Sequence, residues 1–183
     1  MKKNFFVKIF AVLLFCAASN VGLQAQDTFT RGDKVINLGI GLGSNLSGAG
    51  FKSSVPPLSG SFEYGLIGNL FNNKSSFGIG GYVGYAADKW KKTSLGHNYV
   101  ILGVRGSFHY QFADRLDTYL GVMGGYNIVR LKGYDDTKIS DVNSGFAYSF
   151  YLGSRYYLLE KLAAFAEIGY GISFLQLGLA YKF

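Results

Sequence analysis

Apolar side chains alternate with small or polar ones, residue by residue, in eight consecutive runs between Val35 and Phe183. A β-strand places successive side chains on opposite faces, so this period of two predicts strands. The runs cover residues 35–43, 58–67, 76–87, 98–112, 117–129, 144–158, 162–170 and 174–183. No helical pattern interrupts them, so the sequence predicts an all-β chain whose strands follow one another directly.

The composition agrees with this pattern and argues against two other classes of protein. Of the 183 residues, 26 are Gly, 16 are Phe and 14 are Tyr, whereas only 16% are charged. This content of large apolar side chains is too high for a disordered chain. The glycine content is too high for a helical bundle, because Gly is a poor helix former. The length fits a single domain.

Residues 1–25 have the features of a secretory signal peptide. Three lysines form a positive start, residues 9–18 are uninterruptedly apolar, and Ala25 offers a small residue for cleavage. Cleavage would leave residues 26–183 as one barrel domain. Cys16 is the single cysteine of the chain and would leave with the signal, so disulfides and thiolate metal sites are excluded from the mature protein. We expect an exported protein without a cofactor or a bound metal.

The connections between the runs differ in length. Residues 47–57, 88–97 and 130–143 form long connections, whereas residues 113–116 and 159–161 form tight turns. Long loops at one end and short turns at the other are typical of an up-and-down transmembrane barrel. The alternation of long and short connections therefore favours a barrel over an open sheet.

The apolar face of this barrel is predicted to contact lipid, whereas the apolar face of a soluble barrel would enclose a ligand. The opposite face is built from Gly, Ser, Ala, Tyr and isolated charges, which suit the narrow interior of an eight-stranded barrel. Aromatic side chains of the apolar face fall near the strand ends, where the two interfacial belts of a membrane barrel form. They are Tyr85, Tyr126, Phe146 and Tyr148 toward the loops and Phe112, Tyr156, Tyr181 and Phe183 toward the turns. The sequence thus predicts an eight-stranded antiparallel up-and-down transmembrane β-barrel.

The signal peptide, the eight runs and the ending Leu179-Ala180-Tyr181-Lys182-Phe183 together resemble the small bacterial outer-membrane barrels of the OmpA, OmpX and OmpW type. The resemblance covers the mature chain and implies a location in the bacterial outer membrane, in contact with lipid and lipopolysaccharide. It also implies that the terminal aromatics Tyr181 and Phe183 form the signal read by the outer-membrane assembly machinery.

Charged side chains on the inward face are expected to form a network in the lumen. They are Glu63, Arg105, His109, Arg155 and Glu167. Unpaired charges are costly in a tight interior, so they should pair with one another. Arg155 and Glu167 flank the turn at residues 159–161, and the sequence predicts that they pair diagonally across this hairpin. Such a network makes either a structural plug or a gated small pore.

Two other groups of residues suggest a catalytic or a surface role. Ser107 and His109 share a strand face and could belong to a lipid A-modifying hydrolase, but they point into the lumen and residues two apart on a strand are about 6–7 Å apart. The long connection at residues 88–97 carries lysines beside an aromatic residue, which could hold lipopolysaccharide phosphates or could simply be solvated. These residues are Lys89, Trp90, Lys91 and Lys92.

The sequence therefore favours an integral outer-membrane barrel with a structural or surface-interaction role and a lumen largely filled by side chains. A narrow porin-like channel for ions or small molecules is the alternative function, and a lipid A-modifying enzyme is a weaker one. We expect no enzymatic activity and no nucleic-acid partner.

Overall fold

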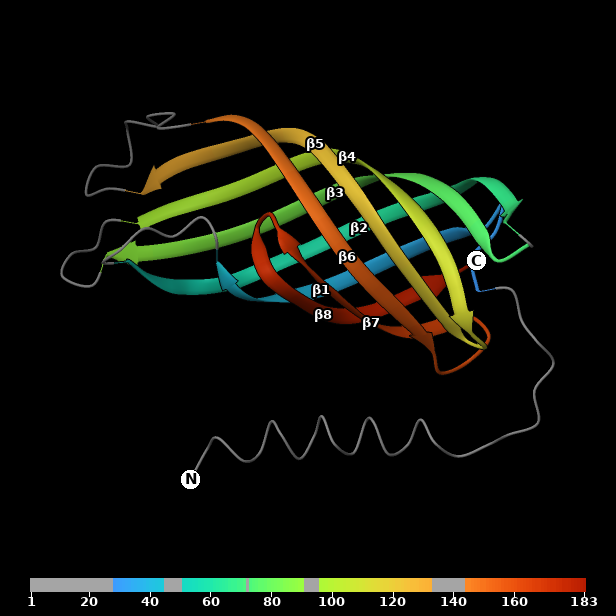
Figure 1. Cartoon of the computed structure of the whole chain (residues 1–183). Coiled ribbons are helices and arrows are strands. Elements are labelled where there is room, and N and C mark those ends of the chain that lie inside the picture. Colours follow the sequence, from blue (N-terminus) through green and yellow to red (C-terminus); the bar gives the residue numbers. More distant parts are fainter. Residues whose placement is uncertain (1–27, 45–50, 72, 91–95, 133–143) are drawn as a thin grey trace, which may run out of the picture.

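The computed structural model describes residues 28–44, 51–71, 73–90, 96–132 and 144–183. In this part of the chain, eight antiparallel strands form one closed barrel in which every strand pairs with its neighbours in the sequence (Figure 1). The strands are β1 (Lys34–Ser44), β2 (Phe51–Leu70), β3 (Ser75–Trp90), β4 (Gly96–Ala113), β5 (Leu116–Lys132), β6 (Gly145–Tyr157), β7 (Leu162–Tyr170) and β8 (Ser173–Lys182). The predicted fold class is confirmed. The predicted signal peptide, residues 1–25, lies outside the described residues.

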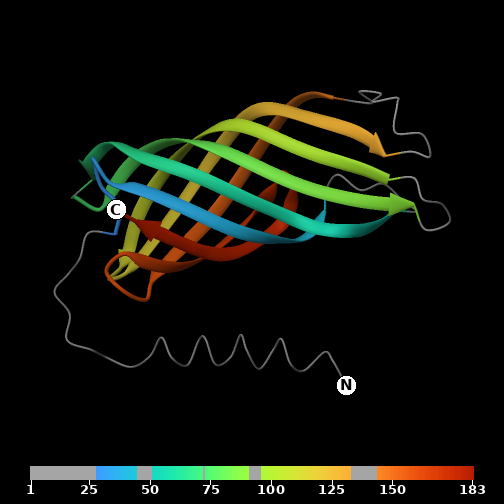
Figure 2. The same ribbon diagram turned by 180° about the vertical axis from the view of Figure 1, so that it is seen from behind.

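The barrel closes between its first and last strands. β1 pairs with β8 from Val35 opposite Lys182 to Ser44 opposite Ser173, and the two strands lie side by side in both views (Figure 2). Closure gives the backbone groups of the terminal strands partners within the barrel, which a bilayer cannot supply. Among the described residues, no helix is both long enough and apolar enough to cross a membrane.

The two faces of the strands are inverted relative to a water-soluble protein. In β1, the side chains of Leu38 and Ile40 are 65% and 54% exposed, whereas Asn37 on the other face is 3% exposed. The same alternation of exposed apolar and buried small or polar residues runs along the central parts of the other strands. An apolar surface of this extent is stable only against lipid. The inside-out assignment from the sequence is therefore confirmed.

The strands differ in length, and the difference shapes the loop end of the barrel. β7 has 9 residues and β8 has 10, which is just enough for a tilted strand to cross a bilayer. β2 has 20 residues and β4 has 18, so they continue well beyond that length. In Figure 1 the β7–β8 hairpin turns back far short of the tips of β3, β4 and β5. The barrel wall is therefore low on the side of β7 and β8.

The first predicted loop, residues 47–57, is wrong over most of its length because β2 begins at Phe51. Pro56 and Pro57 suggest a loop, but the register shifts between Ser53 and Val55 and between Val55 and Leu58. Such bulges accommodate prolines, which cannot donate a ladder hydrogen bond.

The predicted loop at residues 88–97 is also shorter in the structure, since β3 runs to Trp90 and β4 begins at Gly96. The buried carboxylate of Asp88 stabilises the extended ends of β3 and β4 through hydrogen bonds. It accepts a hydrogen bond from the backbone N–H of His97 at 3.1 Å and another from the Tyr99 hydroxyl at 3.0 Å. His97 is thus a strand residue, and its ring Nδ1 lies 3.2 Å from the same carboxylate.

Candidate functional site

The lumen holds the densest group of charged side chains in the described part of the chain, and Arg155 is at its centre. The guanidinium donates from Nη1 to Asp117 at 2.9 Å, from Nε to the Asn37 side-chain oxygen at 3.0 Å, and from Nη2 to Glu63. Arg155 is fully buried, and both carboxylates are 1% exposed. Four strands, β1, β2, β5 and β6, therefore meet through one side chain.

The predicted pairing of Arg155 with Glu167 is wrong. Arg155 stands opposite Asp117 in the β5–β6 register, so a carboxylate on the neighbouring strand is closer than one diagonally across the next hairpin. The tight turns fix the registers within their own hairpins, but the β5–β6 register lies across the long connection at residues 133–143. The sequence alone gives no such register, and Asp117 was missed for this reason.

His109 extends the Arg155 cluster toward the turn end. Its Nδ1 lies 2.9 Å from Asp117 Oδ1, and its Nε2 lies 3.1 Å from Glu63 Oε1. Both partners are carboxylates, so a doubly protonated ring donates on both sides. With that ring and Arg155 positive, the two buried carboxylates are balanced, which is the condition under which buried charges are tolerated.

A second cluster lies nearer the loop end and contains the remaining predicted charges. Arg105 Nη2 donates to Glu167 at 2.7 Å, and the Tyr119 hydroxyl donates to the same carboxylate at 3.2 Å. Arg105 Nε donates to the Tyr151 hydroxyl at 3.0 Å, and its guanidinium lies 3.9 Å from the centre of that ring. The five charges predicted for the lumen are all buried, but they form two clusters instead of one.

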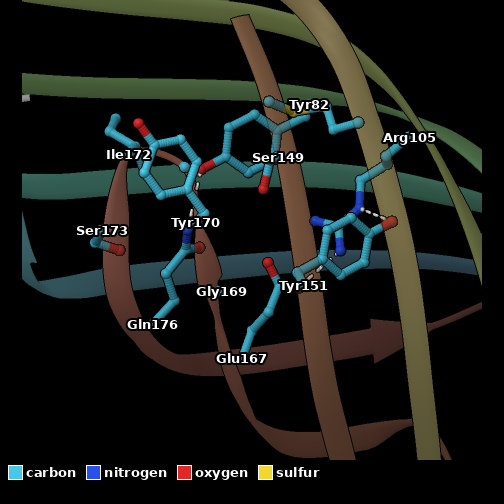
Figure 3. Close-up of a pocket in the computed structure, with 12 residues that line it drawn as sticks. Tyr82, Arg105, Ser149, Tyr151, Glu167, Gly169, Tyr170, Ile172, Ser173 and Gln176 are labelled. Carbon is cyan, nitrogen blue, oxygen red and sulfur yellow. Dashed lines mark hydrogen bonds and ion pairs between the residues drawn. The ribbon is translucent and has the colours of Figure 1, made fainter. Parts of the chain in front are cut away.

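Aromatic rings fill the space between the two clusters because glycines face them. A Cβ atom added to Gly153 would collide with the ring of Tyr119, and one added to Gly121 would collide with the ring of Tyr151. Glycine is required at such close approaches. Figure 3 shows residues that line the cavity beside the Arg105–Glu167 pair, among them Gln176, whose Nε2 donates to the Tyr82 hydroxyl at 3.1 Å. The cavity volume of about 10 Å³ holds roughly one water molecule.

The segment just before β1 closes the turn end of the lumen, which the sequence did not predict. The Phe29 ring is 7% exposed and stacks on His109 with 4.1 Å between ring centres. The Ser76 hydroxyl donates to the Phe29 carbonyl at 2.9 Å, and the Thr28 N–H donates to the Gln111 side-chain oxygen at 3.3 Å. Phe29 lies outside the alternating runs, so the period of two does not mark it as a lumen residue.

The geometry argues against the hydrolase that was considered from the sequence. The Ser107 hydroxyl lies 2.9 Å from the Tyr151 hydroxyl, and both ring nitrogens of His109 are engaged by carboxylates. A general base needs a free acceptor nitrogen within reach of its nucleophile. Within the described ranges, no group of three or more His, Cys, Asp or Glu side chains is arranged to hold a metal ion.

The predicted surface residues lie at opposite ends of the barrel. Lys89 and Trp90 are exposed at the loop end of β3, whereas Lys91 and Lys92 lie outside the described residues. At the turn end, the rings of Tyr181 and Phe183 are about half exposed and stack with 6.3 Å between their centres. Their role as an assembly signal stays a prediction.

Comparison with solved structures identifies the fold. The chain is similar to Ail, the attachment invasion locus protein of Yersinia pestis, with a TM-score of 0.52, 12% identity and coverage of 84% of this chain and 100% of that one. It is also similar to the outer membrane protein OprG of Pseudomonas aeruginosa, with a TM-score of 0.53, 11% identity and coverage of 86% and 99%.

No protein-family model matches this sequence, and a search of curated proteins finds no match. At these identities the similarity shows the fold, and the exposed apolar band independently shows a surface that contacts lipid. The chain therefore has the fold of the small bacterial outer-membrane β-barrel proteins, and its exposed apolar band faces the lipid of a membrane.

Proposed function

We propose that this protein is a closed, non-enzymatic outer-membrane barrel that anchors a surface for interactions at its loop end. The observation that supports this proposal best is the double barrier in the lumen. The Arg105–Glu167 pair joins β4 and β7, the Arg155 cluster joins four strands, and Phe29 covers the turn end. An eight-stranded interior is narrow enough for side chains to fill it, whereas open aqueous channels need about twice as many strands.

The loop end offers charge for an anionic partner. Lys89 and Arg130 are exposed on strands that extend beyond the β7–β8 hairpin, and Trp90, which follows Lys89 in β3, is 46% exposed. Cationic side chains near an aromatic residue suit phosphate groups at the outer surface of a membrane. The partner proposed here is lipopolysaccharide. A barrel of the same fold, Ail, has been crystallised with the heparin analogue sucrose octasulfate, which is also polyanionic.

Planar-bilayer recording tests the closed lumen. We expect the purified mature chain to give only small and infrequent current events. The variant Glu167→Ala combined with Glu63→Ala and Phe29→Ala should give larger and more frequent events, because each of the two clusters loses a carboxylate and the turn end loses its cover. A steady, large conductance of the unmodified protein would contradict the proposal and favour the porin-like channel.

Vesicle binding tests the surface role. Mature protein in nanodiscs should bind vesicles that contain lipopolysaccharide more tightly than zwitterionic vesicles, and Lys89→Glu combined with Arg130→Glu should weaken this preference. The matched control is Lys161→Glu, which changes an exposed lysine at the turn end. If the control weakens binding as much as the loop-end variant, the attraction depends on net charge and not on this surface.

A further inference from the structure

The N-terminal segment, residues 28–33, folds across the turn end of the barrel before β1 begins. Its outer part pairs with β2, because the Gly65 carbonyl accepts from the Gly32 N–H at 2.9 Å and the Gly65 N–H donates to the Asp33 carbonyl at 2.9 Å. Its inner part, Thr28 and Phe29, is attached to side chains of other strands. In addition to the bonds from Gln111 and Ser76, the Lys182 ammonium of β8 donates to the Thr28 carbonyl at 3.3 Å. The inner part can therefore leave the lumen without breaking a strand ladder.

His109 is the lumen residue on which Phe29 stacks, with an angle of 29° between the two rings. The titratable and charged side chains that surround the imidazole come from β2, β5 and β6, and they are Glu63, Asp117, Tyr119 and Arg155. On β3, the residue opposite His109 is Ser76, which carries no charge. The charge of this end of the lumen is thus set by two carboxylates, one guanidinium and one imidazole.

This group of charges is balanced while the imidazole of His109 is protonated on both nitrogens. Arg155 and the imidazolium then supply two positive charges against Glu63 and Asp117. A neutral ring has a single N–H donor, so one of the two carboxylates that contact it, at 2.9 and 3.1 Å, loses a hydrogen bond. The loss of one proton also leaves one uncompensated negative charge where both carboxylates are buried, and such a charge is costly. Deprotonation therefore favours a rearrangement that admits water.

Phe29 is the neighbour of His109 that can move at the lowest cost. The strands that carry the charged side chains are each paired on both sides in the closed barrel, whereas Phe29 precedes β1. A cation over an aromatic ring is attracted to it, and the Arg155 guanidinium lies 5.7 Å from the centre of the Phe29 ring. When the stacked imidazole becomes neutral, its part of this attraction is lost. The same event thus weakens the docking of Phe29 and creates a demand for the water that Phe29 excludes.

We propose that the N-terminal segment is a pH-responsive plug, which is docked while His109 is charged and leaves the lumen when this imidazole loses its proton. Imidazole is the side chain that ordinarily changes charge between about pH 5 and pH 8. Release of Phe29 lets water reach Glu63 and Asp117, which solvates the unbalanced charge. The Arg105–Glu167 pair is a separate barrier, so release does not by itself open the barrel. This inference goes beyond the proposed function and does not depend on it.

A nitroxide spin label on the N-terminal segment reports its docking directly. With residues 1–25 removed, the chain has no cysteine, because Cys16 is its single one. Arg31→Cys therefore gives one attachment point at an exposed position of the segment. Electron paramagnetic resonance spectra of the labelled mature chain in nanodiscs are recorded from about pH 6 to about pH 9, which spans the ordinary titration of imidazole. We expect the ratio of mobile to immobilised label to rise roughly tenfold, as for the loss of a buried hydrogen bond. A label at Lys161→Cys, in the exposed turn between β6 and β7, should not change.

Two variants of the labelled chain separate charge balance from other effects of pH. His109→Gln leaves Arg155 alone against two carboxylates, so the label should be mobile already at the lowest pH. Glu63→Gln leaves Arg155 balanced by Asp117 when His109 is neutral, so the label should stay immobilised at the highest pH. The Lys182 ammonium, which also holds the segment, is the same in both variants. A label mobility that does not change with pH when His109 and Glu63 are both present, or an undiminished response in Glu63→Gln, would overturn the proposal. The comparison with Glu63→Gln remains decisive if His109→Gln fails to fold.

Discussion

Replacing Arg155 by Leu should destabilise the barrel more than any single change of an exposed charge. The side chain is fully buried and donates to Glu63, Asp117 and Asn37. Removing one partner of a buried ion pair costs about 3–5 kcal/mol, because the remaining charge stays buried without compensation. Here two carboxylates lose their shared cation, and His109 in its protonated form can balance only one of them. We therefore expect a loss of about 3–5 kcal/mol in the free energy of unfolding.

Reversible urea unfolding of the mature chain in lipid vesicles, followed by circular dichroism, measures this loss. Arg130→Leu is the matched control because Arg130 is exposed, and it should change stability by less than about 0.5 kcal/mol. Adding Glu63→Gln to Arg155→Leu restores the charge balance and should recover part of the loss. A cost below about 1 kcal/mol for Arg155→Leu alone, or no recovery in the double variant, would refute the view that the cluster is a charge-balanced unit.

Three further predictions concern other parts of the barrel. Leu102→Arg places a cation on the lipid face, where Leu102 is 50% exposed, and should make the free energy of folding into vesicles less favourable by about 2–4 kcal/mol. The control Trp90→Arg, at the end of β3, should cost less than about 1 kcal/mol, and equal costs would contradict the inside-out arrangement. Gly153→Ala should destabilise the protein by about 1–3 kcal/mol, because the added methyl group collides with Tyr119, whereas Gly81→Ala, which meets no atom within 4 Å, should be nearly neutral in the same urea titration. Phe29→Ala should uncover the turn end, so a Ser76→Cys probe should react faster with a water-soluble thiol reagent than it does with Phe29 present, while an unchanged rate would show that the segment does not cover the lumen.

The location of the strands and the direction of their faces could be predicted from the sequence because both depend on local order. A period of two in a run such as residues 98–112 assigns each side chain to a face without knowledge of any partner strand. The abundance of glycine on one face and of large apolar residues on the other then decides which face meets lipid. The five lumen charges were identified on the same grounds, and all are buried.

The pairing of those charges depended on tertiary structure. Which carboxylate meets Arg155 is decided by the register between β5 and β6 and by the closure of the barrel, which brings Glu63 from β2 across the lumen. Neither quantity is encoded in neighbouring residues. The docking of Phe29 likewise arises from contacts between segments that are far apart in the sequence. Local alternation thus determined the barrel and its orientation toward lipid, whereas only the closed structure decided how its interior is sealed, because long-range register brings the sealing groups together.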